Sequence, residues 1–476
     1  MSSRSWARYL TAGALFGVAL VLPAQAQPVP AQAQPPADPL AGSSGLGDPY
    51  YPEDGNGGYD VRHYDVAIDY DPPSRQLVGK ARIDATATQA LHAFNLDYAG
   101  PAVSAVSVNN LPAGFVRHGE HELTVTPALP VLPGLPFTVT VDYAGAEGDT
   151  ANNGWTISSS GGAFAAGEPH SATSWYPLND TPMDKATFDL QVTVPQEWQA
   201  VSNGLRVGDR VEGDKRVVRW STQRPTVGYL TTVAIDHFDF LEQRRADGTP
   251  LISAFAPDAD QDKKLEQRLP EILDFIESVY GPYPFESGGG IYVDTDLPFS
   301  LETQTRPIYA PWTDLNTVVH ENTHQWWGDS MSVRNWSDVC LNECFASYTA
   351  DYLWPERKEG EDVDAMYRET LAKTLDMPKF WEIPLQNPGA GREFTAVYYR
   401  GPLFLHALRH ELGDDVFFPA VAQFVQSHAY GNASMPEFRE FMQSRAATDL
   451  SGFFAAWLDS TTVPPDQYLY PGDLRG

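Results

Sequence analysis

The sequence predicts a multi-domain protein in which an N-terminal all-β twisted sandwich is followed by a domain of mixed α/β and helical structure. From Tyr59 to Phe240, apolar residues alternate at period two in segments such as VRHYDVAIDYD, FTVTVDYAG and ATFDLQVTVP, with Pro, Gly and Asn between the segments. After Thr249 the periodicity becomes helical, as in LEQRLPEILDFIESVYG and LFLHALRHELG. The 476 residues are enough for two or three domains. We expect the β-domain over 49–245 and the second domain over 246–476.

The N-terminal region has the pattern of an exported protein. Residues 1–26 combine two early arginines, a short apolar run and an AQA sequence of small residues, which is typical of a secretory signal peptide. A retained membrane anchor is the alternative. Residues 27–48 are rich in Pro, Ala, Gln and Gly, which predicts a disordered linker. We therefore expect a periplasmic or secreted protein without membrane attachment once the signal is removed.

The net charge of the chain limits the classes of partner that it could bind. The 62 acidic and 32 basic residues give a formal net charge of −30, which argues against nucleic-acid partners and anionic membranes. We expect a soluble, self-repelling monomer.

The only two cysteines are Cys340 and Cys344. On a regular helix their Cβ atoms would be about 5–6 Å apart, whereas a disulfide needs about 3.5–4.5 Å. Two buried thiols are therefore expected rather than a disulfide, although export would permit one.

The stretch VVHENTHQWWGDS carries the strongest chemical pattern. Residues four apart on a helix share a face, so His320 and His324 could offer imidazole nitrogens to one metal ion, with Glu321 beside them. The alternative is an amphipathic core helix with incidental histidines, because a chain of this length contains H-E-x-x-H by chance about one or two times in a hundred. The following Trp326 and Trp327 are expected to pack behind the helix.

A third ligand is needed, because catalytic zinc commonly takes two histidines and one glutamate and keeps a position for water. Glu343, in DVCLNECFASY, lies 19 positions after His324. We expect a second helix, with Asp338 as its N-cap and Pro355 after its end, that runs antiparallel to the first. That pairing would bring Glu343 back beside the histidines. The alternative is an exposed glutamate on an unrelated surface.

Together, these motifs resemble the aminopeptidase N and leukotriene hydrolase family of gluzincin zinc peptidases. HENTHQWWGDS is similar to the family's H-E-x-x-H-Q-W-F-G-N, and WSDVCLNECFASY to its W-x-D-x-W-L-N-E-G-F-A-x-Y. YDVRHYDVAIDYD and WYPLNDTPMDKATFDLQVTVP resemble the family's N-terminal β-domain. The resemblance implies a thermolysin-like catalytic domain and one Zn²⁺ held by His320, His324 and Glu343. It also implies that Glu321 is the general base.

The resemblance further implies two acids that bind the free amino group of a peptide. FSLETQTRPIYA occupies the place of the family's G-x-M-E-N loop, so Glu302 matches the amine-binding glutamate. Phe299 replaces the glycine of that motif and Thr303 replaces its asparagine. A fixed carboxylate suits an ammonium group. Nine residues before PLNDTP, Glu168 matches a second amine-contacting position. The alternative for each is an ordinary acid without a ligand.

A tyrosine and a second histidine pair complete the candidates. VYYRG resembles the family's V-Y-E-K-G, in which the tyrosine hydroxyl stabilises the tetrahedral oxyanion; Tyr398 takes that place, and Tyr399 replaces the glutamate. A phenol can donate a hydrogen bond while it is neutral at pH 7.

His406 and His410 also lie four apart, but no glutamate follows the first and apolar residues flank them. We expect helix-face histidines there rather than metal ligands.

The implied function is a zinc-dependent aminopeptidase that acts on peptides with a free N-terminus. The chain resembles a two-domain form without the C-terminal helical domain that many members carry, for which a more open cleft is expected. Two alternatives remain. One is a secreted zinc endopeptidase that does not need a free amine, and the other is a catalytically silent peptide-binding protein.

Overall fold

The computed structural model describes residues 40–475 except 147–153, 171, 258 and 260–262. The expected signal peptide and most of the expected linker lie outside the described residues. In the part of the chain that is described, no helix is long and apolar enough to cross a membrane.

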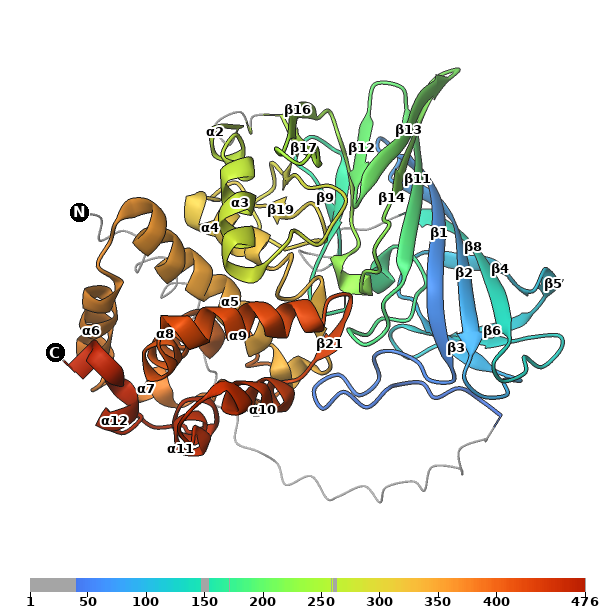
Figure 1. Cartoon of the computed structure of the whole chain (residues 1–476). Helices are drawn as coiled ribbons and strands as arrows, with labels where there is room; N and C mark the ends of the chain where they lie inside the picture. Colours follow the sequence, from blue (N-terminus) through green and yellow to red (C-terminus); the bar gives the residue numbers. More distant parts are fainter. Residues whose placement is uncertain (1–39, 147–153, 171, 258, 260–262, 476) are drawn as a thin grey trace, which may run out of the picture. The chain divides into compact units, whose positions relative to one another are not determined.

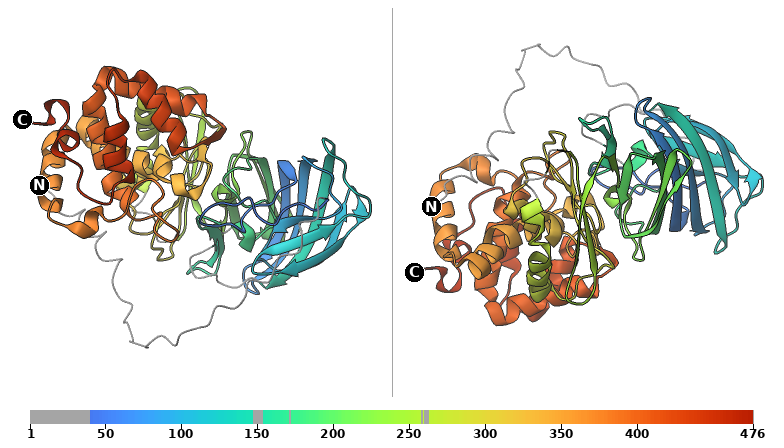
Figure 2. Two further views of the ribbon diagram at one scale, coloured as in Figure 1. Left: turned by 90° about the horizontal axis from the view of Figure 1, so that it is seen from below. Right: turned by 90° about the horizontal axis from the view of Figure 1, so that it is seen from above.

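The β-domain is built around an eight-stranded mixed sheet, coloured blue to green in Figure 1. Its strand order is β13-β14-β11-β1-β2-β8-β4-β5. β1 (Tyr59–Asp71) pairs in parallel with β11 (Thr187–Pro195) and antiparallel with β2 (Gln76–Ala87). Buried side chains alternate with more exposed ones along these strands, because successive residues point to opposite faces. The twist of the sheet is visible in Figure 2. The other strands are β4 (Ala102–Val108), β5 (Leu111–Pro112), β8 (Pro136–Ala146), β13 (Leu205–Glu212) and β14 (Lys215–Ser221).

Two smaller sheets complete the β-domain. Their strand orders are β12-β15-β10-β9 and β3-β7-β6. Trp155, Trp175 and Trp220 are fully buried in the hydrophobic core of this domain. The expected all-β packing of the N-terminal part is therefore confirmed. The strands are β3 (Phe94–Asp97), β6 (Gly114–His118), β7 (Glu122–Thr126), β9 (Gly154–Ile157), β10 (Ala163–Ala166), β12 (Gln199–Ser202) and β15 (Val233–Asp236).

The second domain contains a four-stranded sheet that begins earlier than the sequence indicates. β16 (Asp239–Arg244) pairs antiparallel with β17 (Pro250–Phe255), which pairs in parallel with β18 (Ile291–Tyr292), and β18 pairs in parallel with β19 (Ile308–Tyr309). The boundary expected at 245/246 falls in the turn of the β16–β17 hairpin, so β16 joins the sheet of the second domain. A period-two pattern does not reveal this, because a strand looks alike whichever sheet it joins.

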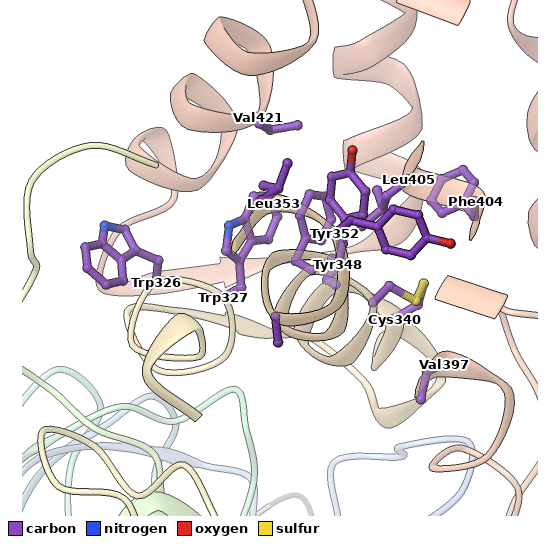
Figure 3. Packing of buried hydrophobic residues seen from close by; sticks show 14 of the residues in the cluster. Trp326, Trp327, Cys340, Tyr348, Tyr352, Leu353, Val397, Phe404, Leu405 and Val421 are labelled. Carbon is purple, nitrogen blue, oxygen red and sulfur yellow. A yellow bond between two sulfur atoms is a disulfide. The ribbon is translucent and has the colours of Figure 1, made fainter. Parts of the chain in front are cut away.

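Helices form most of the second domain, coloured yellow to red in Figure 1. α3 (Leu269–Tyr280) lies in the segment for which the sequence predicts a helix, and Gly281 occupies its C-cap position. Trp326 and Trp327 are both buried, as expected, in the cluster of Figure 3. Trp327 stacks on Phe345 with ring centroids 3.5 Å apart. The other elements are α2 (Lys263–Glu266), α4 (Leu315–Thr323), β20 (Met331–Val333), α5 (Cys340–Tyr348), α6 (Val363–Thr374), α7 (Pro378–Trp381), α8 (Arg400–Leu412), α9 (Asp414–Ser427), β21 (Gly431–Ala433), α10 (Met435–Arg445), α11 (Ser451–Phe454) and α12 (Asp466–Leu469).

The helix that carries Glu343 differs from the expectation at both ends. α5 has Val339 at its N-cap position, while Asp338 is buried at the end of the preceding 3₁₀ turn η4 (Trp336–Asp338) and is not the cap. Pro355 does not end the helical path. The π-helical turns η5 (Thr349–Leu353) and η6 (Pro355–Glu359) continue it to Gly360. Pro355 is tolerated because it opens the second turn, where its missing N–H has no required partner.

The end of the expected linker is ordered. The Gly42 N–H donates to the carbonyl of Ala93 at 2.9 Å in the β-domain. The carboxylate of Asp48 accepts from the N–H of Trp336 at 2.9 Å in the second domain. The disorder predicted for residues 40–48 is therefore wrong, because composition does not reveal hydrogen-bond partners that lie far away in the sequence.

Buried acids in the β-domain make its stability depend on pH. The side chain of Asp180 is almost fully buried and lies close enough to Asp54 to be affected by its charge. Burial, followed by the charge of Asp54, raises the pKa of Asp180 to about 8. His170 opposes this shift, and its Nδ1 lies 2.6 Å from the Asp54 carboxylate. Asp180 is therefore protonated in the folded protein at neutral pH.

Asp180→Asn should remove part of this pH dependence. The folded state keeps the Asp180 proton up to about pH 8, whereas the unfolded carboxyl releases it near pH 4. The contribution of Asp180 is thus fully present below about pH 4 and is lost as the pH rises toward 8. The free energy of unfolding of the variant relative to wild type should rise by about 2–4 kcal/mol between pH 5 and pH 8, measured by urea denaturation. The exposed Asp415→Asn is the control, and an equal pH trend in both variants would contradict the assignment.

Candidate active site and metal centre

The end of α4 presents both histidines of the H-E-x-x-H motif. The carboxylate of Asp314 accepts from the Thr317 N–H at 3.0 Å and caps the start of the helix. α4 ends at Thr323, and His324 follows in a right-handed helical conformation, so one helical path carries both histidines. The Nε2 atoms of His320 and His324 are 3.1 Å apart. The two imidazoles are therefore placed to share one metal ion.

α5 brings Glu343 to this pair, as the sequence predicts. Its Oε2 lies 3.2 Å from the Nε2 of His320 and 3.5 Å from the Nε2 of His324. In a tetrahedral zinc site with bonds of about 2.0–2.1 Å, the ligand atoms are roughly 3.3 Å apart. The observed separations lie close to that value. The donor set and its geometry therefore fit one zinc ion.

The second nitrogen of each histidine is also held. Nδ1 of His324 lies 3.0 Å from the carbonyl oxygen of Trp327, which can only accept a hydrogen bond. This nitrogen therefore carries the proton, and the lone pair of Nε2 is left for a metal. Nδ1 of His320 lies 3.5 Å from Oγ of Ser347 in α5. The orientation of both rings is thus fixed from outside the metal-binding set.

The charges of the cluster favour a bound cation. Burial alone would raise the pKa of Glu343, but His324 and His320 lower it to about 2, so this carboxylate is ionised. Burial raises the pKa of Glu321 and of Glu302. Although burial opposes it, Glu343 and Glu302 raise the pKa of His324. Burying this cluster, in which acids outnumber histidines, has a free-energy cost. A bound divalent cation would offset that cost.

Glu302 and Glu168 both lie at the site, where the resemblance places them. One carboxylate oxygen of each lies within 4.8 Å of a Glu343 oxygen and of one another. The Oε1 atoms of Glu302 and Glu168 are buried and have no hydrogen-bond partner within the described chain. Burial, followed by the charge of Glu302, raises the pKa of Glu168. Two carboxylates with a buried oxygen that lacks a donor make a place where an ammonium group would be bound.

Gln325 holds the loop that carries Glu302, a role that the sequence analysis did not assign. Its Oε1 accepts from the N–H of Thr305 at 2.7 Å, and its Nε2 donates to the carbonyl of Glu302 at 3.2 Å. Thr305 has a φ of 68°, which is unfavourable for threonine. Gln325 directly follows His324, so the metal-binding helix also positions the acid loop. The glutamine after H-E-x-x-H was the available signal.

Tyr398 reaches the site from the turn before α8. It ends the 3₁₀ turn η7 (Ala396–Tyr398), and its ring centroid lies 6.1 Å from that of His320. Burial, followed by the charges of Glu343 and Glu168, raises the pKa of Tyr398. The phenol therefore keeps its proton at neutral pH and can donate a hydrogen bond to an oxyanion.

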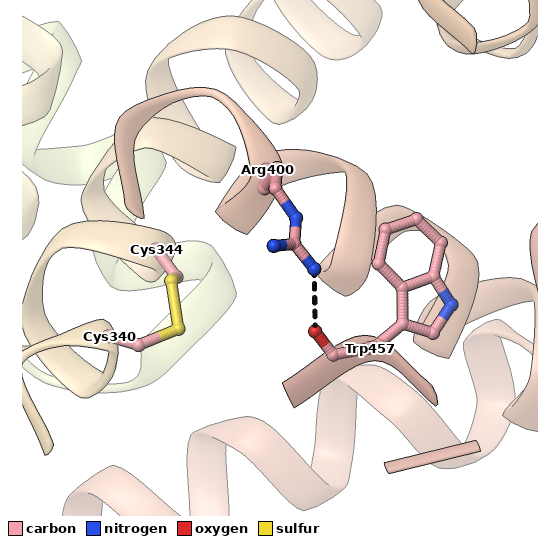
Figure 4. The surroundings of a disulfide bond; sticks show 4 residues. All are labelled: Cys340, Cys344, Arg400 and Trp457. Carbon is pink, nitrogen blue, oxygen red and sulfur yellow. Dashed lines mark hydrogen bonds between the residues drawn. A yellow bond between two sulfur atoms is a disulfide. The ribbon is translucent and has the colours of Figure 1, made fainter. Parts of the chain in front are cut away.

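Arg400 and Gly401, the second and third residues after Tyr398, help to fix its position, and neither was assigned a role from the sequence. The buried guanidinium of Arg400 donates to the carbonyls of Trp381 at 3.0 Å and of Trp457 at 3.2 Å. The second of these bonds is drawn in Figure 4. A Cβ on Gly401 would lie 2.9 Å from the Cα of Cys344, so glycine lets α8 approach α5 closely. α8 and its leading tyrosine are thereby held against the helix that carries Glu343.

Cys340 and Cys344 form a disulfide, contrary to the two thiols expected (Figure 4). Their Cα atoms are 4.8 Å apart, within the usual range of about 4.4–6.8 Å. The prediction assumed regular helical spacing. Cys340 is the first residue of α5 and follows a 3₁₀ turn, so the backbone departs from that spacing. The bridge spans the turn that presents Glu343.

Comparison with known proteins identifies two matching family models. The model of the Peptidase M1 N-terminal domain matches residues 61–230, and that of the Peptidase family M1 domain matches residues 301–457. Endoplasmic reticulum aminopeptidase 1 of Homo sapiens is 26% identical over 441 residues, covering 81% of this chain and 46% of that protein. Aminopeptidase M1 of Arabidopsis thaliana is 24% identical, covering 62% and 36%. The chain thus spans less than half the length of these two relatives.

Solved structures match over nearly the full length of both partners. A crystal structure of an M1 zinc metallopeptidase from Deinococcus radiodurans is 27% identical with a TM-score of 0.78, covering 88% of this chain and 98% of that chain. A mutant M1 zinc metallopeptidase from the same organism, bound to a Tyr-Ser-Ala substrate, has a TM-score of 0.79 and 26% identity, covering 88% and 99%. A two-domain M1 zinc metallopeptidase mutant bound to L-tryptophan has a TM-score of 0.80 and 27% identity, covering 88% and 99%.

Gly401→Ala should destabilise the contact between α8 and α5. The added methyl group would meet Cys344 at distances that require the helices to move apart. We expect the free energy of unfolding to fall by about 1–3 kcal/mol, measured by chemical denaturation. Gly114→Ala is the matched control, because a Cβ there meets no atom closer than 3.6 Å. Wild-type stability of the Gly401→Ala variant would contradict the close approach.

Proposed function

The chain belongs to peptidase family M1, and on that premise we propose that it is a zinc-dependent aminopeptidase that removes N-terminal residues from peptides. The observation that carries the proposal is the joint presence of a His₂Glu metal-binding set and two acids whose buried Oε1 atoms lack partners in the described chain. The metal-binding set alone would serve any zinc hydrolase. The two acids add a place for a free ammonium group, which an endopeptidase does not need. The aminopeptidase names of the relatives and the Tyr-Ser-Ala substrate of one neighbour support the same conclusion.

His320, His324 and Glu343 would hold the zinc ion. When bound, zinc lowers the pKa of a coordinated water and polarises the scissile carbonyl. Three protein ligands are the number typical of catalytic zinc, which keeps a further position for water. The fixed Nδ1 proton of His324 keeps its Nε2 lone pair directed toward the centre.

Glu321 is the proton carrier of the proposed reaction. One of its carboxylate oxygens lies within 4.8 Å of a ligand atom of His324. Burial raises its pKa, which brings the carboxylate closer to the operating pH of a general base. The water oxygen bonds to the carbonyl carbon while its proton passes to Glu321. The same proton then passes to the departing amine nitrogen as the C–N bond breaks, so one water is consumed for each peptide bond.

Tyr398 donates its hydroxyl hydrogen to the oxyanion that forms on the carbonyl oxygen. Its raised pKa keeps it a donor throughout the reaction, because the acids around it oppose loss of the proton. A donor that is already in place is worth most where charge develops. Arg400 and Gly401 are positioning residues for this group, since they hold the start of α8.

Glu302 and Glu168 bind the substrate's ammonium group. The carboxylates of Glu168, Glu302 and Glu343 lie within 4.8 Å of one another, so an amine held by the first two places the first peptide bond beside the metal-binding set. Binding of the ammonium also stabilises the ionised form of the two acids, whose pKa values burial raises. This anchoring limits cleavage to the N-terminal residue.

An endopeptidase is the second candidate. Phe299 and Thr303 depart from the amine-binding motif of the family, and a weaker amine site would relax the need for a free N-terminus. The two buried Oε1 atoms, which lack donors in the described chain, would then be a cost with no ligand to offset it. A silent peptide-binding protein would have no use for Glu321 together with all three metal donors.

Export and a monomeric state are further parts of the proposal. The signal-like pattern of residues 1–26 supports export to the periplasm or the medium, and the net charge of −30 disfavours self-association. N-terminal sequencing of the secreted protein checks the first proposal, with Gln27 expected as the first residue. Sedimentation analysis checks the second, and a dimer at micromolar concentration would contradict it.

Glu321→Gln should nearly abolish turnover while zinc stays bound. The amide cannot accept the water proton, and the three metal donors are unchanged. We expect kcat to fall by about 10²–10⁴-fold with an unaltered zinc content, measured by peptidase assay and elemental analysis. Glu440→Gln, an exposed position of α10, is the matched control. Retained activity of Glu321→Gln would remove it from the mechanism.

The amine anchor predicts a strong preference for a free N-terminus. We expect cleavage of a leucyl anilide and no cleavage of its N-acetylated twin, with activity lost on chelation and restored by zinc. Glu302→Gln should lower kcat/KM by about 10–100-fold at constant zinc content, because a charge-assisted hydrogen bond to the ammonium is lost. Equal cleavage of both substrates would discard the anchor and favour the endopeptidase.

A further inference from the structure

We propose that Asp364, His406 and His410 bind a second divalent transition-metal ion, with zinc as the default, in a structural site separate from the candidate active site. These residues come from α6 and α8. One potential ligand atom of each lies within 4.8 Å of those of the other two. The histidine pair was expected to be helix-face residues, because no glutamate follows His406 and apolar residues flank the pair. Asp364, which completes the set, lies 42 positions before His406.

The separations in this cluster match those of a metal site. Oδ1 of Asp364 lies 3.0 Å from Nε2 of His406 and 3.1 Å from Nε2 of His410. Ligand atoms of tetrahedral zinc are roughly 3.3 Å apart, given bonds of about 2.0–2.1 Å. Two imidazoles and one carboxylate are also a ligand chemistry that suits zinc.

The candidate active site offers a comparison within the same chain. His320 and His324 have ring centroids 4.9 Å apart with an interplanar angle of 70°. The corresponding values for His406 and His410 are 4.7 Å and 63°. In both pairs the residues are four apart on one helical path and a carboxylate from another helix lies against both Nε2 atoms. The second pair therefore repeats the geometry of the first.

The second nitrogen of His410 is held as it is in metal-binding histidines. Its Nδ1 lies 2.5 Å from Oδ1 of Asp473, in the 3₁₀ turn η9 (Gly472–Arg475). A ligating imidazole commonly donates this second N–H to a carboxylate, which leaves Nε2 for the metal. Nδ1 of His406 lies 3.4 Å from the hydroxyl of Tyr348. The His410 ring thus lies between the carboxylates of Asp364 and Asp473.

The surroundings suit a structural ion. His406 is fully buried, and the rings of Tyr352 and Tyr367 lie 4.9 Å and 5.1 Å from its ring. The side chain of Asp364 is 35% exposed, which leaves a route for the ion. The nearby guanidinium of Arg409 is already bound to Glu356 and Asp414. No general base comparable to Glu321 follows His406, since Ala407 occupies that position.

Such an ion would tie together three segments that lie far apart in the sequence. It would join α6 directly to α8, and it would hold η9 through Asp473. α8 begins two residues after Tyr398 with Arg400, which helps to position this tyrosine. The ion would therefore also stiffen the helix next to Tyr398. The site does not depend on the proposed peptidase function.

Zinc stoichiometry of the full chain tests the proposal. Protein equilibrated with zinc sulfate and dialysed against metal-free buffer should contain two zinc ions per chain by elemental mass spectrometry. Asp364→Asn and His410→Gln should each contain one. Asp415→Asn, an exposed acid at the start of α9, should keep two. One zinc in wild type with no loss in Asp364→Asn would overturn the proposal and leave a hydrogen-bonded cluster without a metal.

A second variant separates this site from the candidate active site. His320→Gln combined with His324→Gln removes the two histidine donors of that site and should still bind one zinc. Zinc sulfate should raise the Tm of this double variant, and Asp364→Asn in the same background should abolish both the binding and the shift. If wild type binds one zinc and the double variant binds none, the second site is overturned and the first site stands. If wild type and the double variant each bind one zinc, and Asp364→Asn removes that zinc, the second site is supported and the first site is overturned.

Discussion

The contact of Glu343 with His320 and His324 is the interaction on which the arrangement of the second domain depends. The three donor atoms come together only if α4 and α5 lie close enough for Glu343 Oε2 to approach both Nε2 atoms. The stacking of Trp327 on Phe345 holds the two helices from behind. A buried carboxylate costs several kcal/mol unless positive charge accompanies it. Burial of the Glu343 carboxylate between α4 and α5 therefore requires both the packing of the two helices and the positive charge of a metal ion.

Local patterns could be predicted from the sequence, whereas most contacts between distant segments could not; the approach of Glu343 to the two histidines is the exception. The spacing of His320 and His324 specifies a shared helix face, and period-two alternation specifies the strands of the β-domain, because both depend on neighbours within a few residues. The disulfide, the partner sheet of β16 and the contacts of Arg400 depend on segments that only the folded chain brings together. Glu302, Glu168 and Tyr398 were located by resemblance, since nothing in their local sequence distinguishes them from ordinary acids and tyrosines.

The buried acids of the molecule differ in whether their oxygens have hydrogen-bond partners and in where they lie. Glu266 is fully buried, and its two carboxylate oxygens accept hydrogen bonds from Ser253 and from Tyr292. Glu302 is buried and Glu168 is half-buried beside the metal-binding set, and the Oε1 of each is buried with no donor in the described chain. Buried carboxylate oxygens without a donor also occur away from this set, as on Asp180 and Glu122. It is therefore the position of the Glu302 and Glu168 oxygens beside the metal donors that makes them candidates for binding a ligand.

The two histidine pairs have similar geometry and different surroundings. His320 with His324 and His406 with His410 have nearly the same ring geometry and the same type of third donor. Their surroundings differ: acids with unpartnered oxygens lie around the first pair, and tyrosine rings lie around the second. An ion bound beside the first pair would have Glu321 and the unpartnered oxygens of Glu302 and Glu168 within reach, whereas Ala407 takes the place of Glu321 at the second pair. The same ligand set thus supports catalysis or structure according to the groups that lie just outside it.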